Sequence, residues 1–418
     1  MRSNKKAIDR KADKFRTSYG FIAACAGSAV GLGNIWGFPS RLGRGGGFSF
    51  LILYILCLAL AGIPLLTAEL SIGKQYGASP PAAFRAIHPR LGLIGLMQVL
   101  ACFITLCYYC YFGGKLLEYT AAAVGLKLSG PLLWDIIFTL VTGIIVFLGV
   151  QAGIERCSRI LMPVLVIILA GLCVFSFSLD GSREALAFMF KPDFTFFNAD
   201  TFSSALTQLL FSLSVGYGCM ITFGAYGAKN SMLKPAIAIA AADTIVAVLA
   251  ALFIIPSAFV CRISPASGPT LLFDVVPLIF SRLTGSQFMI PVFFSMVFFA
   301  ALTSSVSMME VPAVMLMQET KLSRKSSINI IIILTILCSF PICISLRVFE
   351  AYEFISQYLL ICISSVFTCI AAGWMMKKDY STALGNAPSV VEKSLVILLC
   401  FVTPALLLIV PVSVLTGH

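Results

Sequence analysis

The chain has 418 residues, of which 59% are hydrophobic and 11% are charged, and its formal net charge is +11. Because soluble globular proteins are only about 45–50% apolar and about 25% charged, this composition excludes an ordinary soluble protein. Lysine and arginine gather in alternate loops between apolar stretches, so the positive charge indicates membrane topology, and we expect no nucleic-acid partner.

Recurring apolar stretches predict an all-α, polytopic membrane protein with about eleven transmembrane helices. In chain order, the spans are expected at residues 18–42, 48–73, 92–124, 132–150, 157–179, 201–228, 234–262, 287–318, 327–346, 350–376 and 393–415. The charged tail, residues 1–17, has no signal-peptide core and is expected in the cytoplasm, which places the C-terminus outside a plasma (inner) membrane. Segments 180–200 and 263–286 are then extracellular, and the prolines and glycines of the second suit a helical hairpin that acts as a lid.

The first span contains an unusual polar interruption. Residues Gly27 to Asn34 read GSAVGLGN, with three glycines, a serine and an asparagine in an otherwise apolar stretch. A helix broken at membrane depth survives only where it is buried in protein or lines a cavity. Its freed amides and carbonyls can bind ions and charged solutes, so this break predicts a binding site in mid-membrane.

The sixth span carries a second interruption of the same kind. Residues Phe211 to Gly218 read FSLSVGYG. Paired interrupted helices in corresponding positions of two halves indicate a transporter binding site. The alternative is that these glycines are helix-packing contacts, because glycine is common in membrane helices.

Two isolated acids lie inside predicted spans. An ionised carboxylate at membrane depth costs at least about 2.5–3.5 kcal/mol and needs a cationic partner. Asp243 in the seventh span is expected to face a bound sodium ion, although it could instead pair with Lys234. Glu69 is expected to brace the broken segment from Ser214 to Gly218; the alternative is an interface acid that faces Lys74.

The sequence gives little support for an enzyme. Most of the 14 cysteines lie in apolar spans and are expected to be small hydrophobes. Cys107 and Cys110 have CxxC spacing, but they lie in an apolar helix, and His88 and His418 are the only histidines. We find no nucleophile with a base and no metal cluster, and expect no covalent chemistry.

Four stretches, in order along the chain, resemble the neurotransmitter:sodium symporter family. They are Gly27 to Pro39, Gly45 to Glu69, Phe211 to Thr222 and Ala300 to Glu310. An eleven-span form is similar to the prokaryotic members. The resemblance implies a leucine-transporter-type fold, with an inverted repeat of five plus five spans. It divides the chain into a tail (1–17), a first repeat (18–179), an extracellular loop (180–200), a second repeat (201–376) and an extra span (377–418).

The same resemblance implies two sodium sites. Sodium is a hard cation that prefers oxygen ligands, so hydroxyls, amides and free carbonyls are suitable donors. The first site would be formed by Ala29, Asn34, Ser212 and Asp243, together with the substrate carboxylate. The second would be formed by Gly27, Val30, Ala300, Thr303 and Ser304, although these hydroxyls could simply bond between helices or to their own backbone.

An amino-acid substrate is expected between the first, third, sixth and eighth spans. The amides of Gly31 to Gly33 and the Tyr109 hydroxyl would hold the carboxylate, since helix amino ends attract anions. Carbonyls near Ala29, Phe211 and Ser214 would meet the ammonium group. The expected substrate-binding residues are Ser28, Ala29, Gly31, Leu32, Gly33, Thr105, Tyr109, Phe211, Ser214, Tyr217, Ser304 and Met308. Ordinary packing is the alternative for both tyrosines.

The gates depart from the family pattern. Gly37 stands where the family has a basic residue, and Arg41, one helical turn further on, could substitute for it against Glu353 or Glu350. At the cytoplasmic side, Ala12 and Gln318 stand where a gate pair is usual. Replacement partners there are expected among Lys11, Lys14 and Glu319.

The sequence as a whole predicts a sodium-coupled symporter that imports a neutral, hydrophobic or aromatic amino acid by alternating access, independently of chloride. A proton-coupled amino-acid or amine carrier of the same fold, titrating Asp243 or Glu69, is the alternative. The expected partners are the amino acid, sodium as coupling ion and membrane lipid, with no organic cofactor. A monomer or weak dimer is expected.

Overall fold

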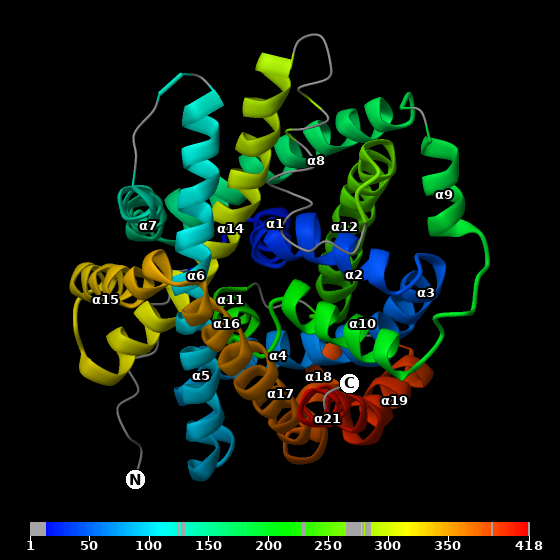
Figure 1. Ribbon diagram of the computed structural model, residues 1–418. Coiled ribbons are helices and arrows are strands. Elements are labelled where there is room, and N and C mark those ends of the chain that lie inside the picture. Colours follow the sequence, from blue (N-terminus) through cyan, green and yellow to red (C-terminus); the bar gives the residue numbers. More distant parts are fainter. Residues whose placement is uncertain are drawn as a thin grey trace.

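The computed structural model describes residues 14–123, 125–126, 130–179, 181–227, 231–264, 277, 280, 286–385 and 388–416. Within these residues all regular secondary structure is helical, which confirms the predicted all-α class (Figure 1). Most of the predicted tail and of the predicted lid at 263–286 lies outside the described residues.

Eight helical segments in the described part of the chain are long and apolar enough to cross a membrane. They are Phe48–Tyr76 (α3, Phe48–Cys57, and α4, Ile63–Tyr76), Pro89–Ala123 (α6, Gly92–Ala123), Val150–Ser176 (α8, Arg156–Ser176), Leu233–Val260 (α12, Leu233–Cys261), Ile290–Thr320 (α14, Ser286–Thr320), Arg324–Ile344 (α15), Leu346–Met375 (α16, Leu346–Glu353, and α17, Cys362–Ile370) and Ser389–Val412 (α19, Ser389–Ile397, to α21, Ile409–Thr416). A ninth results if α1 (Ser18–Ala29) and the helix over Gly33–Arg44 (ending in α2, Phe38–Arg44) form one span, bent by 54°.

The other two predicted spans are covered by shorter helices. The fourth corresponds to α7 (Pro131–Phe147). The sixth is split into α10 (Ala199–Ser212) and α11 (Cys219–Tyr226), with a non-helical segment between them. Each of the eleven predicted spans therefore coincides with a helix or with a broken pair of helices.

Three short helices occupy segments that were expected to be loops. These are α5 (Pro80–Ile87), α9 (Ser182–Phe190) and α18 (Lys377–Leu384). α5 has proline at its first helical position, where the missing N–H costs nothing because that donor has no partner inside the helix. These helices are short and of mixed composition, so no long apolar stretch marks them in the sequence.

The broken helices lie in the interior of the molecule. In Figure 1, α1 lies in the middle of the bundle between α14 and α12, and α2 packs against α12. Nine of the twelve residues of α1 are buried, whereas only seven of the 21 residues of α8 are, so α1 is enclosed by protein and α8 exposes one face. This burial meets the condition under which broken backbone is tolerated at membrane depth.

Glycines allow the close approach of α4 and α11. A Cβ atom on Gly73 would lie 1.9 Å from the Ile221 carbonyl oxygen, and one on Gly224 would lie 2.5 Å from the Leu70 carbonyl oxygen. Small residues permit this contact because membrane helices associate through packing rather than through a hydrophobic driving force. The two helices form one support beneath the break in the sixth span.

Candidate functional site

The break in the first span begins after α1. The Val30 N–H donates to the Ala26 carbonyl oxygen at 2.7 Å and closes the helix, and Val30 itself has extended backbone. The amide of Gly31 then donates to Asn34 Oδ1 at 2.9 Å. The asparagine side chain thus replaces the helical acceptor that the break removes.

The break in the sixth span is tied to the first. Ser214, Gly216 and Gly218 all have positive φ angles, and that of Ser214 is 51° although it is not a glycine. The Ser214 hydroxyl donates to the Ser28 carbonyl oxygen at 2.7 Å. Strained backbone of this kind persists only where its surroundings hold it, and it concentrates at binding sites.

Glu69 braces the second break, as the sequence predicted. Its Oε1 accepts the Gly216 N–H at 2.8 Å and the Gln98 side-chain N–H at 3.2 Å, and the whole side chain is buried. The alternative, in which Glu69 faces Lys74 at a membrane surface, does not fit this position. The carboxylate satisfies backbone that the helix itself leaves unpaired.

Asp243 lies with Asn34 and Ser212 in one buried cluster. Asp243 Oδ1 accepts from Asn34 Nδ2 at 2.7 Å and from the Ser212 hydroxyl at 2.9 Å, and Oδ2 accepts from the Tyr54 hydroxyl at 3.3 Å. Asp243 forms no ion pair with any described residue, which excludes the expected alternative partner Lys234. The Asn34 amide turns its N–H toward Asp243, and its oxygen accepts from Gly31. The Asp243 carboxylate and the Ser212 hydroxyl therefore supply the oxygens here that suit a hard monovalent cation. Ala29, the fourth predicted ligand, is the buried last residue of α1.

The residues predicted for the second sodium site lie where α14 meets the end of α1. The Ser304 hydroxyl lies 3.3 Å from the Gly27 carbonyl oxygen and 3.1 Å from that of Val30, so α14 meets the end of α1 here. The Thr303 hydroxyl lies 3.1 Å from the Ala300 carbonyl oxygen. The Thr303 hydroxyl also lies 3.2 Å from the Phe299 carbonyl oxygen of its own helix. Both hydroxyls therefore make the own-backbone and helix-to-helix bonds that were the expected alternative, and sodium binding here stays a prediction.

The residues predicted to hold a carboxylate surround the first break. The Tyr109 hydroxyl accepts the Leu32 N–H at 3.2 Å. A Cβ atom on Gly31 would lie 2.6 Å from both the Tyr109 and the Ser304 hydroxyl oxygens, and one on Gly33 would lie 2.7 Å from the Phe211 ring. A larger residue at either position would have to displace Tyr109, Ser304 or Phe211, so the backbone of the break lies close to these side chains.

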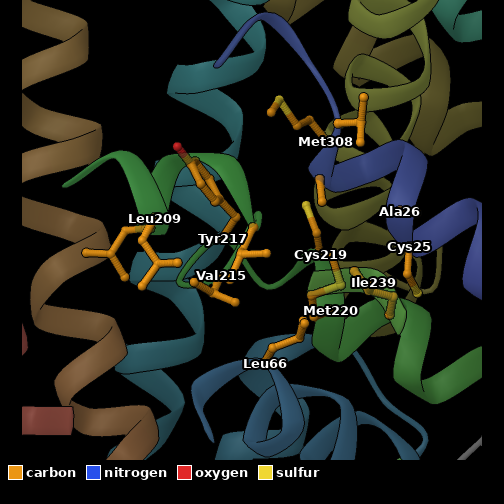
Figure 2. Close-up of a cluster of buried hydrophobic side chains, with 14 of the residues drawn as sticks. Cys25, Ala26, Leu66, Leu209, Val215, Tyr217, Cys219, Met220, Ile239 and Met308 are labelled. Carbon is orange, nitrogen blue, oxygen red and sulfur yellow. The ribbon is translucent and has the colours of Figure 1, made fainter. Parts of the chain in front are cut away.

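The remaining predicted pocket residues lie deeper. Figure 2 shows Tyr217 in the segment between α10 and α11 and Met308 on α14, within a cluster of buried apolar side chains. Both are almost completely buried, as is Thr105 on α6. Among the described residues the Tyr217 hydroxyl has no hydrogen-bond partner of normal geometry, although Thr105 lies beside it. Ser28 also belongs here, since its hydroxyl lies 2.7 Å from that of Ser307.

Three residues of this region were missed by sequence reasoning. Ser307 follows Ser304 by one helical turn and could have been found from that spacing. Gln208 and Tyr54 gave no local signal, because each reaches the site only through tertiary packing.

A cavity of about 730 Å³ opens above the first break. We call it the vestibule. Its wall includes Trp36, Tyr109, Phe112, Phe211 and Phe349, with the charged residues Arg41, Arg44, Lys115, Asp200, Glu350 and Glu353 around it. Leu32 and Tyr109, which were predicted to hold a carboxylate, therefore lie in the wall of this cavity.

The predicted gate residues Arg41 and Glu353 line the vestibule without forming an ion pair. Arg41 donates to Gln208 Oε1, and Gln208 Nε2 donates in turn to the Gly33 carbonyl oxygen at 2.9 Å. Glu353 accepts from Gln357 at 3.2 Å. Each gate residue is held by a neighbouring glutamine, and the vestibule between them is open.

The opposite end of the bundle is closed by side chains. The Arg324 guanidinium pairs with the buried Glu310 at 2.6 Å, and the Tyr226 hydroxyl donates to Glu310 at 2.7 Å. Glu155 accepts the Arg16 N–H at 2.7 Å, and the Phe15 ring packs against Tyr226.

The expected replacements at this end are only partly in place. Glu319 pairs with Arg85 at 3.2 Å, and Gln318 accepts the Ser79 N–H at 2.8 Å. Neither meets a base from the N-terminal tail among the described residues, and Lys11 and Ala12 lie outside them.

Comparisons with known proteins agree with this geometry. The model of the sodium:neurotransmitter symporter family matches residues 12–128 and 110–417. A sodium-dependent transporter of Haemophilus influenzae is 28% identical, over 94% of this chain and 96% of its own, and the sodium-dependent transporter YhdH of Bacillus subtilis is 33% identical, over 81% and 80%. The crystal structure of MhsT in complex with L-phenylalanine superposes with a TM-score of 0.89 at 32% identity, over 96% of this chain and 99% of that one.

Proposed function

Because the chain belongs to the sodium:neurotransmitter symporter family, and is therefore a membrane-spanning sodium-dependent transporter, we propose that it imports a neutral amino acid with an apolar or aromatic side chain. Sodium is the coupling ion, and chloride is not required. The protein works by alternating access, in which the vestibule end faces outward and the end closed by Arg324 and Glu310 faces the cytoplasm.

The pocket walls support the substrate class. Phe211, Tyr217 and Met308 are large and mostly apolar. Burying an apolar substrate side chain against them is favourable by about 25 cal/mol per Å² of apolar surface. A charged side chain would lose its hydration without gaining a partner there. MhsT, which is 32% identical over nearly the whole chain, was crystallised with phenylalanine. The glycine amides near Tyr109 supply donors for the carboxylate that such substrates share.

The observation that carries the ion requirement is the buried Asp243 beside Asn34 and Ser212. This carboxylate supplies a permanent negative charge at the proposed first sodium site. A site that already contains this charge does not need to borrow one from an anion, so uptake should be indifferent to chloride. The second proposed site, around Ser304, consists of neutral oxygens and takes its ion without a built-in counter-charge.

A proton-coupled carrier is the second candidate, because one observation favours it as well. Asp243 has no basic partner among the described residues, and a carboxylic acid in that position can carry a proton instead of facing sodium. The two candidates differ in which gradient drives uptake.

The test is uptake of labelled phenylalanine into proteoliposomes. We expect uptake with an inward sodium gradient, no loss when gluconate replaces chloride, and no uptake with a proton gradient alone. Asp243→Asn should lose most of its uptake, whereas Glu184→Gln, which changes an exposed acid of α9, should behave as wild type. Uptake that stops without chloride would refute the ion proposal, and uptake driven by protons without sodium would favour the second candidate.

A panel of unlabelled amino acids tests the substrate class. Leucine, phenylalanine and tryptophan should compete with the labelled substrate, whereas glutamate and lysine should not. Strong competition by an acidic amino acid, or by an amine that lacks a carboxylate, would contradict the pocket.

A further inference from the structure

A second fully buried acid lies outside the site described above. Asp135 is on α7, and its side chain is completely enclosed. Its Oδ2 accepts from the Ser339 hydroxyl of α15 at 2.5 Å, whereas its Oδ1 has no hydrogen-bond partner among the described residues. Asp135 forms no ion pair with any residue that the structure describes. A membrane carboxylate with an unused oxygen and no base calls for a ligand.

The register of α7 against α15 places more oxygens beside it. Figure 1 shows these two helices on one flank of α6. Asp135 meets Ser339, Gly143 packs on Ile332, and the Val146 carbonyl oxygen accepts from Arg324 at 2.9 Å, so the helices are antiparallel. One helical turn from the Asp135–Ser339 bond, Thr139 on α7 and Thr335 on α15 are therefore expected to face each other.

Both of these threonines are anomalous in the same way as Asp135. Thr139 and Thr335 are completely buried, and neither hydroxyl has a hydrogen-bond partner of normal geometry among the described residues, although the Cys110 thiol of α6 lies beside Thr139. A buried hydroxyl without a partner is uncommon, because it has lost its water and gained nothing. Three unpartnered oxygens within one helical turn of a single contact indicate one shared ligand rather than three separate defects.

The chemistry of the donors selects the ligand. The carboxylate can only accept hydrogen bonds while ionised, and an oxygen set of one carboxylate and three hydroxyls suits a hard monovalent cation. The cationic side chain of Lys115 on α6 is turned to the Tyr111 ring, 5.3 Å from its centre. No base among the described residues pairs with Asp135, and sodium is the coupling ion of the family.

We propose that Asp135, Thr139, Thr335 and Ser339 bind a sodium ion at the contact of α7 with α15. This site is separate from both sodium sites around the broken helices and does not rest on the proposed substrate. It joins two helices that are packed together along their length, so the bound ion stabilises this pair. Three residues further along α7 from Thr139, the Thr142 hydroxyl lies 2.9 Å from the hydroxyl of Ser305 on α14.

The experiment measures sodium alone on the purified full chain in detergent, without amino acid. Equilibrium binding of ²²Na⁺ gives the stoichiometry, and thermal unfolding at increasing NaCl, with N-methylglucamine chloride keeping ionic strength constant, gives the affinity. We expect Asp135→Asn to bind one sodium ion fewer than wild type. In an Asp243→Asn, Thr303→Ala, Ser304→Ala background, we expect Asp135→Asn to abolish the sodium-dependent stabilisation that remains.

Valine substitutions separate a ligand from a packing defect. Thr139→Val and Thr335→Val keep the volume and remove the hydroxyl. At a sodium site, each should weaken the Asp135-dependent sodium affinity at least about tenfold. Thr120→Val on α6 is the matched control, because its hydroxyl bonds to the Leu116 carbonyl oxygen within its own helix.

Three results would overturn the proposal. One is wild-type stoichiometry and sodium dependence in Asp135→Asn. Another is Asp135→Asn that is more stable than wild type at every sodium concentration, which indicates an uncharged acid. The third is a pair of valine variants that gain stability without losing sodium affinity. None of these results affects uptake at the Asp243 site, so they leave the proposed function standing.

Discussion

The Tyr109 hydroxyl contacts the first break through the Leu32 amide, across 3.2 Å. We propose that it turns to donate to the substrate carboxylate. Tyr109→Phe should then weaken amino-acid binding by about 1.5–3 kcal/mol, the usual value of a charge-assisted hydrogen bond, or roughly 10- to 150-fold. Scintillation-proximity binding of labelled phenylalanine measures this change. Tyr108→Phe is the control, since that hydroxyl bonds to Thr105 and Gln357 instead, and equal effects of both variants would contradict the assignment.

The paired hydroxyls of α14 give a second prediction at this scale. Thr303→Ala together with Ser304→Ala removes the two side-chain oxygens next to the Gly27, Val30 and Ala300 carbonyls. Uptake should then need a much higher sodium concentration for half-maximal rate. Ser305→Ala, whose hydroxyl bonds to Thr142, should keep the wild-type sodium dependence. An unchanged sodium curve in the double variant would show that the second site is wrongly placed.

Gly31 tests whether backbone amides face the substrate. A methyl group there would lie 2.6 Å from two hydroxyl oxygens, so Gly31→Ala must displace Tyr109 or Ser304. We expect it to abolish amino-acid binding while the protein still folds. The control is Gly171→Ala on α8, where an added Cβ meets no atom within 4 Å and helix propensity predicts a gain of up to about 1 kcal/mol. Retained binding in Gly31→Ala would exclude a substrate at this break.

At the scale of elements, the break in the sixth span depends on α4 as much as on its own sequence. Glu69 holds the Gly216 amide, and Glu69→Leu would leave that buried N–H unpaired at a cost of about 1–3 kcal/mol. We expect Glu69→Leu to lower the melting temperature and to abolish uptake. Glu69→Gln keeps an acceptor oxygen and should retain much of both. If Glu69→Gln were as damaging as Glu69→Leu, the charge rather than the hydrogen bond would be the contribution of this residue.

An element could be predicted when a local sequence pattern marks it. The two broken helices were predictable because polar and glycine residues in an apolar span conflict with the rule that lipid-embedded backbone must be paired. The bracing by Glu69 was predictable because an isolated acid needs a partner. The helices α5, α9 and α18 were not, since their formation depends on short, mixed sequences without an apolar run.

Contacts between distant side chains were the hardest to predict. The link from Arg41 through Gln208 to the Gly33 carbonyl joins residues 167 and 175 positions apart in the chain. A single sequence contains no periodic pattern that connects such positions. The Asp135 cluster could not be predicted either, because its residues come together only when α7 packs against α15.

At the scale of the whole molecule, the two ends are in opposite states. The vestibule is open above Tyr109, and the other end is sealed by the Arg324–Glu310 pair and the Phe15 ring. Glu310 is fully buried, so removal of its cationic partner would leave an uncompensated charge, which typically costs about 3–5 kcal/mol. We therefore expect the Arg324–Glu310 pair to stabilise the arrangement in which this end is closed.

Alternating access requires the vestibule to close after the ligands bind. Arg41 and Glu353 line the same cavity, and each is bound to a glutamine that it can release. We expect bound sodium and amino acid to favour their pairing, because ligands select the state that encloses them. In a Ser204→Cys variant, whose new thiol lines the vestibule, a charged thiol reagent should then react about tenfold more slowly, a shift of about 1.4 kcal/mol.

The controls for this last prediction separate gating from binding. Ser178→Cys, at an exposed position outside the vestibule, should react at the same rate with and without ligands, and the parent protein reports the reactivity of its native cysteines. Adding Arg41→Gln or Glu353→Gln to Ser204→Cys should abolish the slowing, yet leave sodium-dependent amino-acid binding, since neither residue belongs to the sodium clusters. If ligands slowed labelling equally in the presence of either substitution, another contact would close the vestibule and Arg41 would only hold Gln208 in place.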